Sequence, residues 1–198
     1  AKTLLELASG TGRYLEQMAR WYEVEGLDIS EPMIRMARKR MPDTTFYDGD
    51  MTDFDLGNAY DAVICMFSSV AYVTELESIG SMITCAAAHL SPGGVLIIEP
   101  WFAPDMWRDD FIGSRVVEGD GVTVARLDTA VRVGHVATMQ WAWSIARNDG
   151  TADAYVEEHA TGLFTAEQYE PLFRSAGLTH EYDPEGLLGR GLHIATKA

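Results

Sequence analysis

The first half of the chain alternates short apolar runs with longer segments whose apolar residues recur at helical spacing. The apolar runs are residues 3–8, 24–27, 45–47, 60–66 and 95–99, and each is predicted to be a strand. Helical patterns lie between them. This alternation is typical of βαβ units, which build a parallel sheet with helices on both faces. We therefore predict an α/β fold with a doubly wound, mostly parallel sheet.

Residues with specific local preferences predict where helices begin and end. Ser30 precedes a helical pattern as an N-cap residue. Residues 74–77 (TELE) and 165–168 (TAEQ) have the pattern of capping boxes, so a helix is predicted to begin at each. Gly177 is well placed to end the second of these helices. Residues 91–94 (SPGG) predict a turn into the strand at 95–99.

After residue 101 the pattern changes to apolar and polar residues in alternation. The alternating segments are 116–117, 122–133, 136–146 and 154–163, and they are separated by glycine-containing turns. Such segments are typical of antiparallel hairpins. We predict a small antiparallel β layer inserted at about residues 101–164, and then two closing strands at 179–182 and 191–196. No linker or repeat interrupts residues 1–198, so we expect a single domain.

The composition narrows the classes of function. The 198 residues are 47% hydrophobic, and 15 basic against 30 acidic residues give a net charge of −15. Sequence-independent binding to nucleic acid is disfavoured, because such binding depends on Lys and Arg that neutralise phosphates. Every apolar run is far shorter than the roughly 20 residues that cross a bilayer, and no leader pattern opens the chain. We expect no nucleic-acid or membrane partner and a cytoplasmic location.

The cysteines and histidines do not predict a disulfide or a metal site. Cys65 and Cys85 lie in apolar stretches without paired spacing, so we expect packing residues. His89, His135, His180 and His193 have no metal-ligand or triad spacing either. We expect no metal cofactor.

The chemistry is expected at the carboxyl ends of the strands, where open α/β sheets bind their ligands. The residues at these ends are 6–12 (ELASGTG), Asp28, Asp50 with Met51, 66–68 (MFS) and 99–101 (EPW). Residues 6–12 form a glycine-rich turn after the first strand, in which the missing Cβ atoms let the backbone approach a ligand. Such a turn is common to several nucleotide-binding folds.

Two cofactors fit a glycine turn of this kind. A dinucleotide fingerprint, GxGxxG, counted from Gly10 places Gly12 second but Leu15 third, where the close packing beside a pyrophosphate calls for glycine. S-adenosylmethionine (SAM) has no pyrophosphate and fits the incomplete fingerprint. Asp28 can then accept both ribose hydroxyl protons, and Asp50 with Met51 can meet the adenine. The strand ends therefore favour SAM.

Four segments resemble, in order, the motifs of class I SAM-dependent methyltransferases. They are residues 6–12, residues 26–30 (GLDIS) followed by Met33 and 37–38, residues 49–51 (GDM), and residues 90–94 (LSPGG). Together with the strand ends, this resemblance implies that SAM is bound by Glu6, Ala8, Gly10, Gly12, Asp28, Ile29, Met33, Asp50, Met51, Met66 and Phe67.

Within that superfamily the chain is similar to the TDP-amino-sugar N,N-dimethyltransferases that complete desosamine and mycaminose. The similarity lies in residues 49–51, 66–69 (MFSS), 99–101, His159 ahead of 163–164, and 189–192 (GRGL). It implies N,N-dimethylation of the amino group of a thymidine-diphosphate (TDP) amino sugar in natural-product biosynthesis. Family members also have a helical lid segment before the first strand. This chain starts almost on that strand, so the lid is expected to be absent or built otherwise.

Three side chains are candidates for handling the substrate's proton. Methyl transfer to an amine needs a neutral nitrogen held behind the methyl group, so a carboxylate, His or Tyr can take a proton from the ammonium form. Tyr72, Glu99 and His159 are the candidate catalytic residues. Each also has a structural interpretation: Tyr72 fills space, Glu99 is a buried acid held by backbone amides, and His159 packs in a hairpin.

Substrate binding is expected from Ser68, Trp101 and Arg190. Arg190 lies between two glycines, and a guanidinium binds a diphosphate with two parallel hydrogen bonds. The alternative is a surface arginine in a tight turn. Trp101 can stack on thymine or line the sugar site, or it can belong to an aromatic cluster between the two layers. Phe102 departs from the family pattern, and Tyr72 stands at a position where family members vary. The exact sugar is therefore left open.

Two other functions remain alternatives. One is methylation of a different small acceptor, such as a glycine-like amine or a sugar hydroxyl. The other is a non-catalytic module that binds SAM or a nucleotide. The faces of the antiparallel layer need cover, so we also expect either a homodimer or packing of this layer over the substrate.

Overall fold

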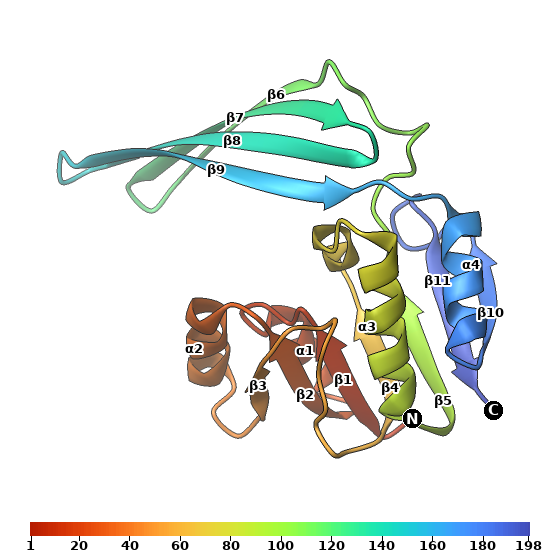
Figure 1. Cartoon of the computed structure of the whole chain (residues 1–198). Helices are drawn as coiled ribbons and strands as arrows, with labels where there is room; N and C mark the ends of the chain where they lie inside the picture. Colours follow the sequence, from red (N-terminus) through yellow and green to blue (C-terminus); the bar gives the residue numbers. More distant parts are fainter.

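The main body of the protein is a seven-stranded sheet in the order β10-β11-β5-β4-β1-β2-β3 (Figure 1). The computed structural model describes residues 1–198. The strands are β1 (Thr3–Leu7), β2 (Glu23–Asp28), β3 (Phe46–Asp48), β4 (Tyr60–Cys65), β5 (Leu90–Ile98), β10 (Leu178–Asp183) and β11 (Leu192–Lys197). Strands β1 to β5 are parallel, and β11 runs antiparallel to both β5 and β10. The predicted mostly parallel α/β sheet is confirmed.

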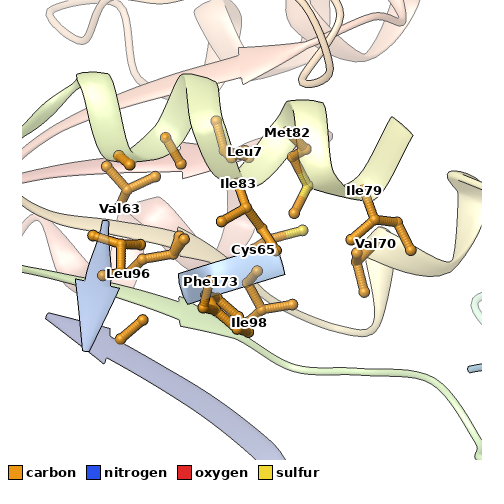
Figure 2. Close-up of a cluster of buried hydrophobic side chains, with 14 of the residues drawn as sticks. Leu7, Val63, Cys65, Val70, Ile79, Met82, Ile83, Leu96, Ile98 and Phe173 are labelled. Atoms are coloured by element: carbon orange, nitrogen blue, oxygen red, sulfur yellow. The ribbon is translucent and has the colours of Figure 1, made fainter. Parts of the chain in front are cut away.

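Helices cover both faces of this sheet, because successive residues of each strand point to opposite sides. The helices are α1 (Arg13–Met18), α2 (Glu31–Arg40), α3 (Leu76–Ala88) and α4 (Ala166–Ser175), and a 3-10 turn, η1 (Ser69–Tyr72), follows β4. Leu5 and Val63 pack into the larger core with α3 and α4, whereas the adjacent Leu4 and Ile64 pack with α1 and α2. Figure 2 shows the larger core between α3 and the sheet. The fold is therefore doubly wound.

A second sheet of four antiparallel strands lies beside the carboxyl ends of the main strands (Figure 1). Its strands are β6 (Ile112–Gly119), β7 (Val122–Val133), β8 (Val136–Arg147) and β9 (Ala152–Gly162), paired in chain order. The predicted antiparallel insertion is confirmed. This sheet covers the edge of the main sheet where ligands bind in α/β folds. No helix has the length and apolar character needed to span a membrane.

Local predictions failed at two points. The predicted capping box at residues 74–77 is wrong: α3 begins at Leu76 after Glu75, without a side-chain cap. His135 Nε2 lies 3.0 Å from the carbonyl oxygen of Thr74, so a contact from the second sheet holds this segment. Residues 91–94 lie inside β5 rather than before it, as an irregularity between the pairs Tyr60–Leu90 and Ala62–Val95.

The other helix-boundary predictions agree with the structure. The capping box at residues 165–168 is present, and the Thr165 N–H donates to Gln168 Oε1 at 2.8 Å. Gly177 adopts φ +75° just after α4. Ser30 is the N-cap residue of α2, although its side chain makes no capping bond. Local residue preferences therefore predicted these ends of α2 and α4 correctly.

Candidate functional site

A cavity of about 340 Å³ opens beyond the ends of β1, β2 and β3. Six residues expected at the site line it: Ala8, Asp28, Ile29, Asp50, Met51 and Tyr72. The remaining walls come from Gly49 and Thr52 and from the segment that joins η1 to α3, namely Val73, Thr74, Glu75 and Ser78. The cavity therefore lies between the glycine turn after β1 and the start of α3.

The buried carboxylate of Asp28 joins the two loops that border this cavity. One oxygen accepts the Gly10 N–H at 2.7 Å, and the other accepts the Ser30 N–H at 2.8 Å. A carboxylate has about four acceptor positions, so each oxygen can still accept a ligand hydroxyl. This arrangement is suited to a ribose diol.

The backbone of the turn at residues 8–12 is mostly left-handed, as the sequence pattern implied. Ala8 has φ +54°, Gly10 φ +56° and Gly12 φ +71°. A Cβ at Gly12 would also lie 3.1 Å from the ring of Phe46, whereas a Cβ at Gly10 would meet no atom within 4 Å. Glycine is thus needed at position 10 for the backbone conformation and at position 12 for both conformation and space.

Glu6 places a buried carboxyl group beside this turn. Its side chain is 3% exposed, and Oε2 has no hydrogen-bond partner. Burial, together with the charge of Asp28, raises the pKa of Glu6 to about 8. A buried acceptor without a partner needs a ligand donor. The ammonium group of SAM fits this requirement, and the ribose fits Asp28.

Six residues expected to bind SAM do not line the cavity: Glu6, Gly10 and Gly12, which belong to the turn beside it, and Met33, Met66 and Phe67. Met66 is buried in the core cluster shared with α1 and α2. Met33 is partly exposed on α2, and Phe67 is exposed at the end of β4. The sequence interpretation had missed Thr52, whose N–H and hydroxyl both donate to Asp50 Oδ1 at 2.8 Å. The Asp-x-Thr spacing of such a turn is a signal that could have indicated it.

The buried carboxylate of Glu99 connects three segments at the centre of the site. Oε1 accepts from Arg190 Nη2 at 2.9 Å, and Oε2 accepts the Phe67 N–H at 2.8 Å. Phe67 and Ser68 have φ values of +55° and +58°, which non-glycine residues rarely adopt. The Ser68 hydroxyl donates to the Pro100 carbonyl at 2.7 Å. These bonds hold a strained turn at the end of β4.

Arg190 is largely buried rather than a surface residue in a turn. Its guanidinium carbon lies 5.1 Å from the ring centre of Trp101 and 5.5 Å from that of Phe102. Its Nε is buried without a hydrogen-bond partner. Arg190, Glu99 and Trp101 are therefore brought together, and Arg190 still has a donor for a ligand.

A second cavity of about 410 Å³ lies between the antiparallel sheet and the segment after β5. Trp101, Phe102 and Trp107 line it from that segment, and Asp128 and Trp141 line it from β7 and β8. The indole N–H groups of Trp101 and Trp107 are buried without partners. Aromatic walls with a few free polar groups are typical of small-molecule sites. The sequence pattern did not show this cavity, because its walls come from two distant segments.

Tyr72 and His159 connect the two cavities. The Tyr72 hydroxyl lies 3.0 Å from His159 Nδ1, and the His159 ring packs on Trp141 with the ring centres 4.0 Å apart. Tyr72 lines the first cavity and Trp141 lines the second. Two of the three candidate catalytic residues are thus hydrogen-bonded to each other at the junction. No three His, Cys, Asp or Glu side chains are close enough together to hold a metal ion.

Comparisons with known proteins identify the relatives of this chain. The family profile described as a methyltransferase domain matches residues 4–94. The dTDP-3-amino-3,4,6-trideoxy-alpha-D-glucopyranose N,N-dimethyltransferase of Streptomyces venezuelae is 40% identical, over 100% of this chain and 84% of that protein. The dTDP-3-amino-3,6-dideoxy-alpha-D-glucopyranose N,N-dimethyltransferase of Streptomyces fradiae is 38% identical, over 97% of this chain and 76% of that protein.

A solved structure shows the same architecture. The SAM-bound amino pentose methyltransferase CalS10 from Micromonospora echinaspora is 36% identical with a TM-score of 0.92, and the match covers 100% of this chain and 84% of that one. The resemblance found in the sequence motifs is confirmed. This chain is a SAM-dependent methyltransferase and belongs to the family of the TDP-amino-sugar N,N-dimethyltransferases.

Proposed function

We propose that this enzyme transfers methyl groups from SAM to the amino group of a TDP-linked amino-deoxy sugar and forms the N,N-dimethyl product. The observation that carries the proposal is the pair of cavities whose walls are linked through the contacts of His159 with Tyr72 and Trp141. One cavity has the groups that suit SAM, and the other has aromatic walls beside a buried arginine. The names of the two curated relatives support a 3-amino sugar as the acceptor.

In this proposal the first cavity holds SAM, which supplies a methyl group on a positively charged sulfur. Asp28 would bind the ribose hydroxyls, Asp50 and Met51 would meet the adenine, and Glu6 would bind the ammonium group. The backbone at Ala8, Gly10 and Gly12 would lie along the ligand, with Ile29 beside the ribose. Met33, Met66 and Phe67 have a weaker claim, because they lie neither in the cavity walls nor in the glycine turn beside it.

The nucleotide sugar would occupy the second cavity and the space beside Arg190. The whole chain carries a net charge of −15, so a diphosphate needs a local cation. Arg190 has a free Nε donor there, and Trp101 offers an aromatic surface. Ser68 lies at the end of β4 next to these residues and binds the Pro100 carbonyl. We assign Ser68 to shaping the substrate site rather than to a direct contact.

The chemistry required of the protein is positioning and exclusion of water. An in-line displacement needs the neutral amine nitrogen behind the methyl group, and orientation in a desolvated site supplies much of the rate acceleration. Glu99 is engaged by Arg190 and by the Phe67 N–H, so its role is to position these groups. Tyr72 and His159 remain as candidates for taking the proton.

The test is turnover by the purified enzyme with SAM and TDP-3-amino-3,6-dideoxyglucose. Mass spectrometry should show a monomethylated product that converts to the dimethylated one. Glycine and the TDP-sugar with a hydroxyl at the same carbon serve as alternative acceptors. Methylation of either one in preference to the amino sugar would support another small acceptor. SAM binding without turnover on any acceptor would support a binding module.

We further infer a homodimer that uses the outward face of the antiparallel sheet. Val116, Leu127, Val131 and Val156 lie on that face and are more than half exposed. A face with several exposed apolar side chains of this kind is suited to cover by a second copy of the chain. Sedimentation analysis should give a dimer, and Leu127→Lys should give a monomer. A monomeric wild-type protein would refute this inference.

We also infer that residues 1–198 form a single domain and that the enzyme works in the cytoplasm. Cys65 and Cys85 are both free thiols, which suits a reducing compartment. Cell fractionation of the producing organism tests the location.

A further inference from the structure

A line of three polar side chains runs from the first cavity toward the surface. The Tyr72 hydroxyl, which faces the cavity, lies 3.0 Å from His159 Nδ1. On the other side of the imidazole, His159 Nε2 lies 3.7 Å from Glu157 Oε2 and has no hydrogen-bond partner. The side chain of His159 is 20% exposed and that of Glu157 is 45% exposed. Tyr72 is 55% exposed, so His159 is the least exposed of the three and lies between a hydroxyl beside the cavity and a solvated carboxylate.

We propose that Tyr72, His159 and Glu157 form a proton relay that neutralises the substrate ammonium before each methyl transfer. The relay rests on the proposed function, because a sugar amine is the group that needs to lose a proton. Tyr72 is the catalytic residue, since it touches the substrate, and His159 and Glu157 position and accept the proton behind it. Glu99 does not compete for this role, because it is buried, is ion-paired with Arg190 and lines neither cavity.

The protons balance in each round of methylation. An N–H bond of the ammonium breaks and its proton forms a new O–H bond on Tyr72, while the original phenol proton moves to His159 Nδ1. The imidazolium then loses a proton from Nε2 to Glu157 and from there to water. The neutral amine attacks the methyl carbon as the sulfur–methyl bond breaks, so one proton is released for each methyl group transferred. Exchange of protons with water returns the imidazole to the tautomer with its proton on Nε2, and the methylammonium product then enters the second round in the same way.

The surroundings of the relay favour proton passage over ionisation of the tyrosine. Burial and the charge of Glu157 raise the pKa of Tyr72, so its hydroxyl keeps a proton at neutral pH. The Trp143 N–H donates to Glu157 Oε2 at 2.8 Å and fixes the carboxylate. From β7, the guanidinium carbon of Arg126 lies 4.5 Å from the ring centre of Trp141, and Arg126 is paired with Asp128. Glu157 is therefore the unpaired charged group that faces His159.

The relay is tested by the pH dependence of turnover with SAM and the TDP-amino sugar. The variants are Tyr72→Phe and His159→Gln, which keep the side-chain shape, and Glu157→Gln. Glu158→Gln is the matched control, because Glu158 is the next residue on β9 and points to the opposite face. Thermal unfolding and the Kd for SAM are measured on each variant.

At pH 6.5 the amine is protonated, and Tyr72→Phe and His159→Gln should lower kcat by about 100-fold. At pH 9.5 the amine is largely neutral, and the same variants should approach the wild-type rate. Glu157→Gln should show a smaller loss with the same recovery, and Glu158→Gln should match the wild type. Equal losses at every pH, or no loss at pH 6.5, would overturn the relay. Wild-type enzyme that fails to methylate the sugar amine would instead refute the proposed function.

Discussion

The Glu99 carboxylate and the Arg190 guanidinium lie 2.9 Å apart, although 91 positions separate them in the chain. Glu99 directly follows β5, and Arg190 precedes β11. The exposed fractions of the two side chains are 3% and 14%, so the ion pair is shielded from water. The same carboxylate also accepts the Phe67 N–H at the end of β4. We therefore expect loss of this pair to change both the affinity for the TDP-sugar and the free energy of unfolding.

Arg190→Ala should weaken binding of the TDP-sugar by about 1.5–3 kcal/mol, because a charge-assisted hydrogen bond to the diphosphate is lost. It should also lower the free energy of unfolding by about 3 kcal/mol, because Glu99 is left buried without its partner. Isothermal titration calorimetry measures the first effect and urea unfolding the second. The affinity for SAM should stay close to that of the wild type.

The double variant Glu99→Gln with Arg190→Met separates these two effects. Replacing both charges removes the uncompensated carboxylate, so much of the unfolding free energy should return. Affinity for the TDP-sugar should stay low, because no cation faces the diphosphate. Recovery of substrate affinity along with stability would show that Arg190 acts only on folding.

Binding of SAM should release a proton from Glu6. The raised pKa of Glu6, about 8, means that the free protein holds a proton there at neutral pH, whereas the SAM ammonium favours the carboxylate. Affinity for SAM should therefore rise by up to about tenfold per pH unit up to pH 8 and level off above it. Calorimetry in buffers of different ionisation enthalpy measures the released proton. The Glu6→Gln variant should bind SAM more weakly, and its affinity for SAM should no longer depend on pH in this way. An unchanged pH dependence of the affinity would contradict the role of Glu6.

Gly26→Ala should disturb the glycine turn from the neighbouring strand. A Cβ at this position would lie 2.6 Å from Ser9 Oγ and 2.8 Å from a ring carbon of Phe46. Overpacking of this kind costs about 1–3 kcal/mol, and displacement of Ser9 should also weaken SAM binding. Gly119→Ala is the control, because its Cβ would meet no atom within 4 Å. Thermal unfolding should separate the two variants, and equal melting temperatures would contradict the packing argument.

His193 should make the protein sensitive to acid. It is fully buried on β11, and its Nδ1 lies 3.0 Å from Nε2 of His180. Burial and the charge of His180 lower the pKa of His193 from 6.5 to about 3. Between these values the unfolded chain binds more protons, so the free energy of unfolding should fall as the pH drops below about 6.5, by up to about 1.4 kcal/mol per pH unit.

His193→Phe keeps the stacking with Tyr169 and removes the titrating group. Its free energy of unfolding should depend less steeply on pH between about 6.5 and 4 than that of the wild type. Urea unfolding at several pH values gives both slopes. Identical slopes for the two proteins would show that another group causes the acid sensitivity.

The parts of the fold that depend on local pattern could be predicted from the sequence. The central strands β1, β4 and β5 are largely buried on both faces, so their apolar runs stand out, and Gly10 and Gly12 follow β1 while Asp28 ends β2. The contact between Tyr72 and His159 spans 87 positions and depends on how the antiparallel sheet packs. No local sequence pattern predicts a contact between residues so far apart in the chain. The same reason applies to the Glu99–Arg190 pair and to the second cavity.

The most direct test of the account is a crystal structure with S-adenosylhomocysteine and the TDP-amino sugar bound together. We predict the ribose of the cofactor on Asp28, the diphosphate on Arg190, and the sugar nitrogen within hydrogen-bond distance of the Tyr72 hydroxyl and in line with the sulfur. A nucleotide sugar bound away from Arg190, or an amine that points away from the sulfur, would contradict it.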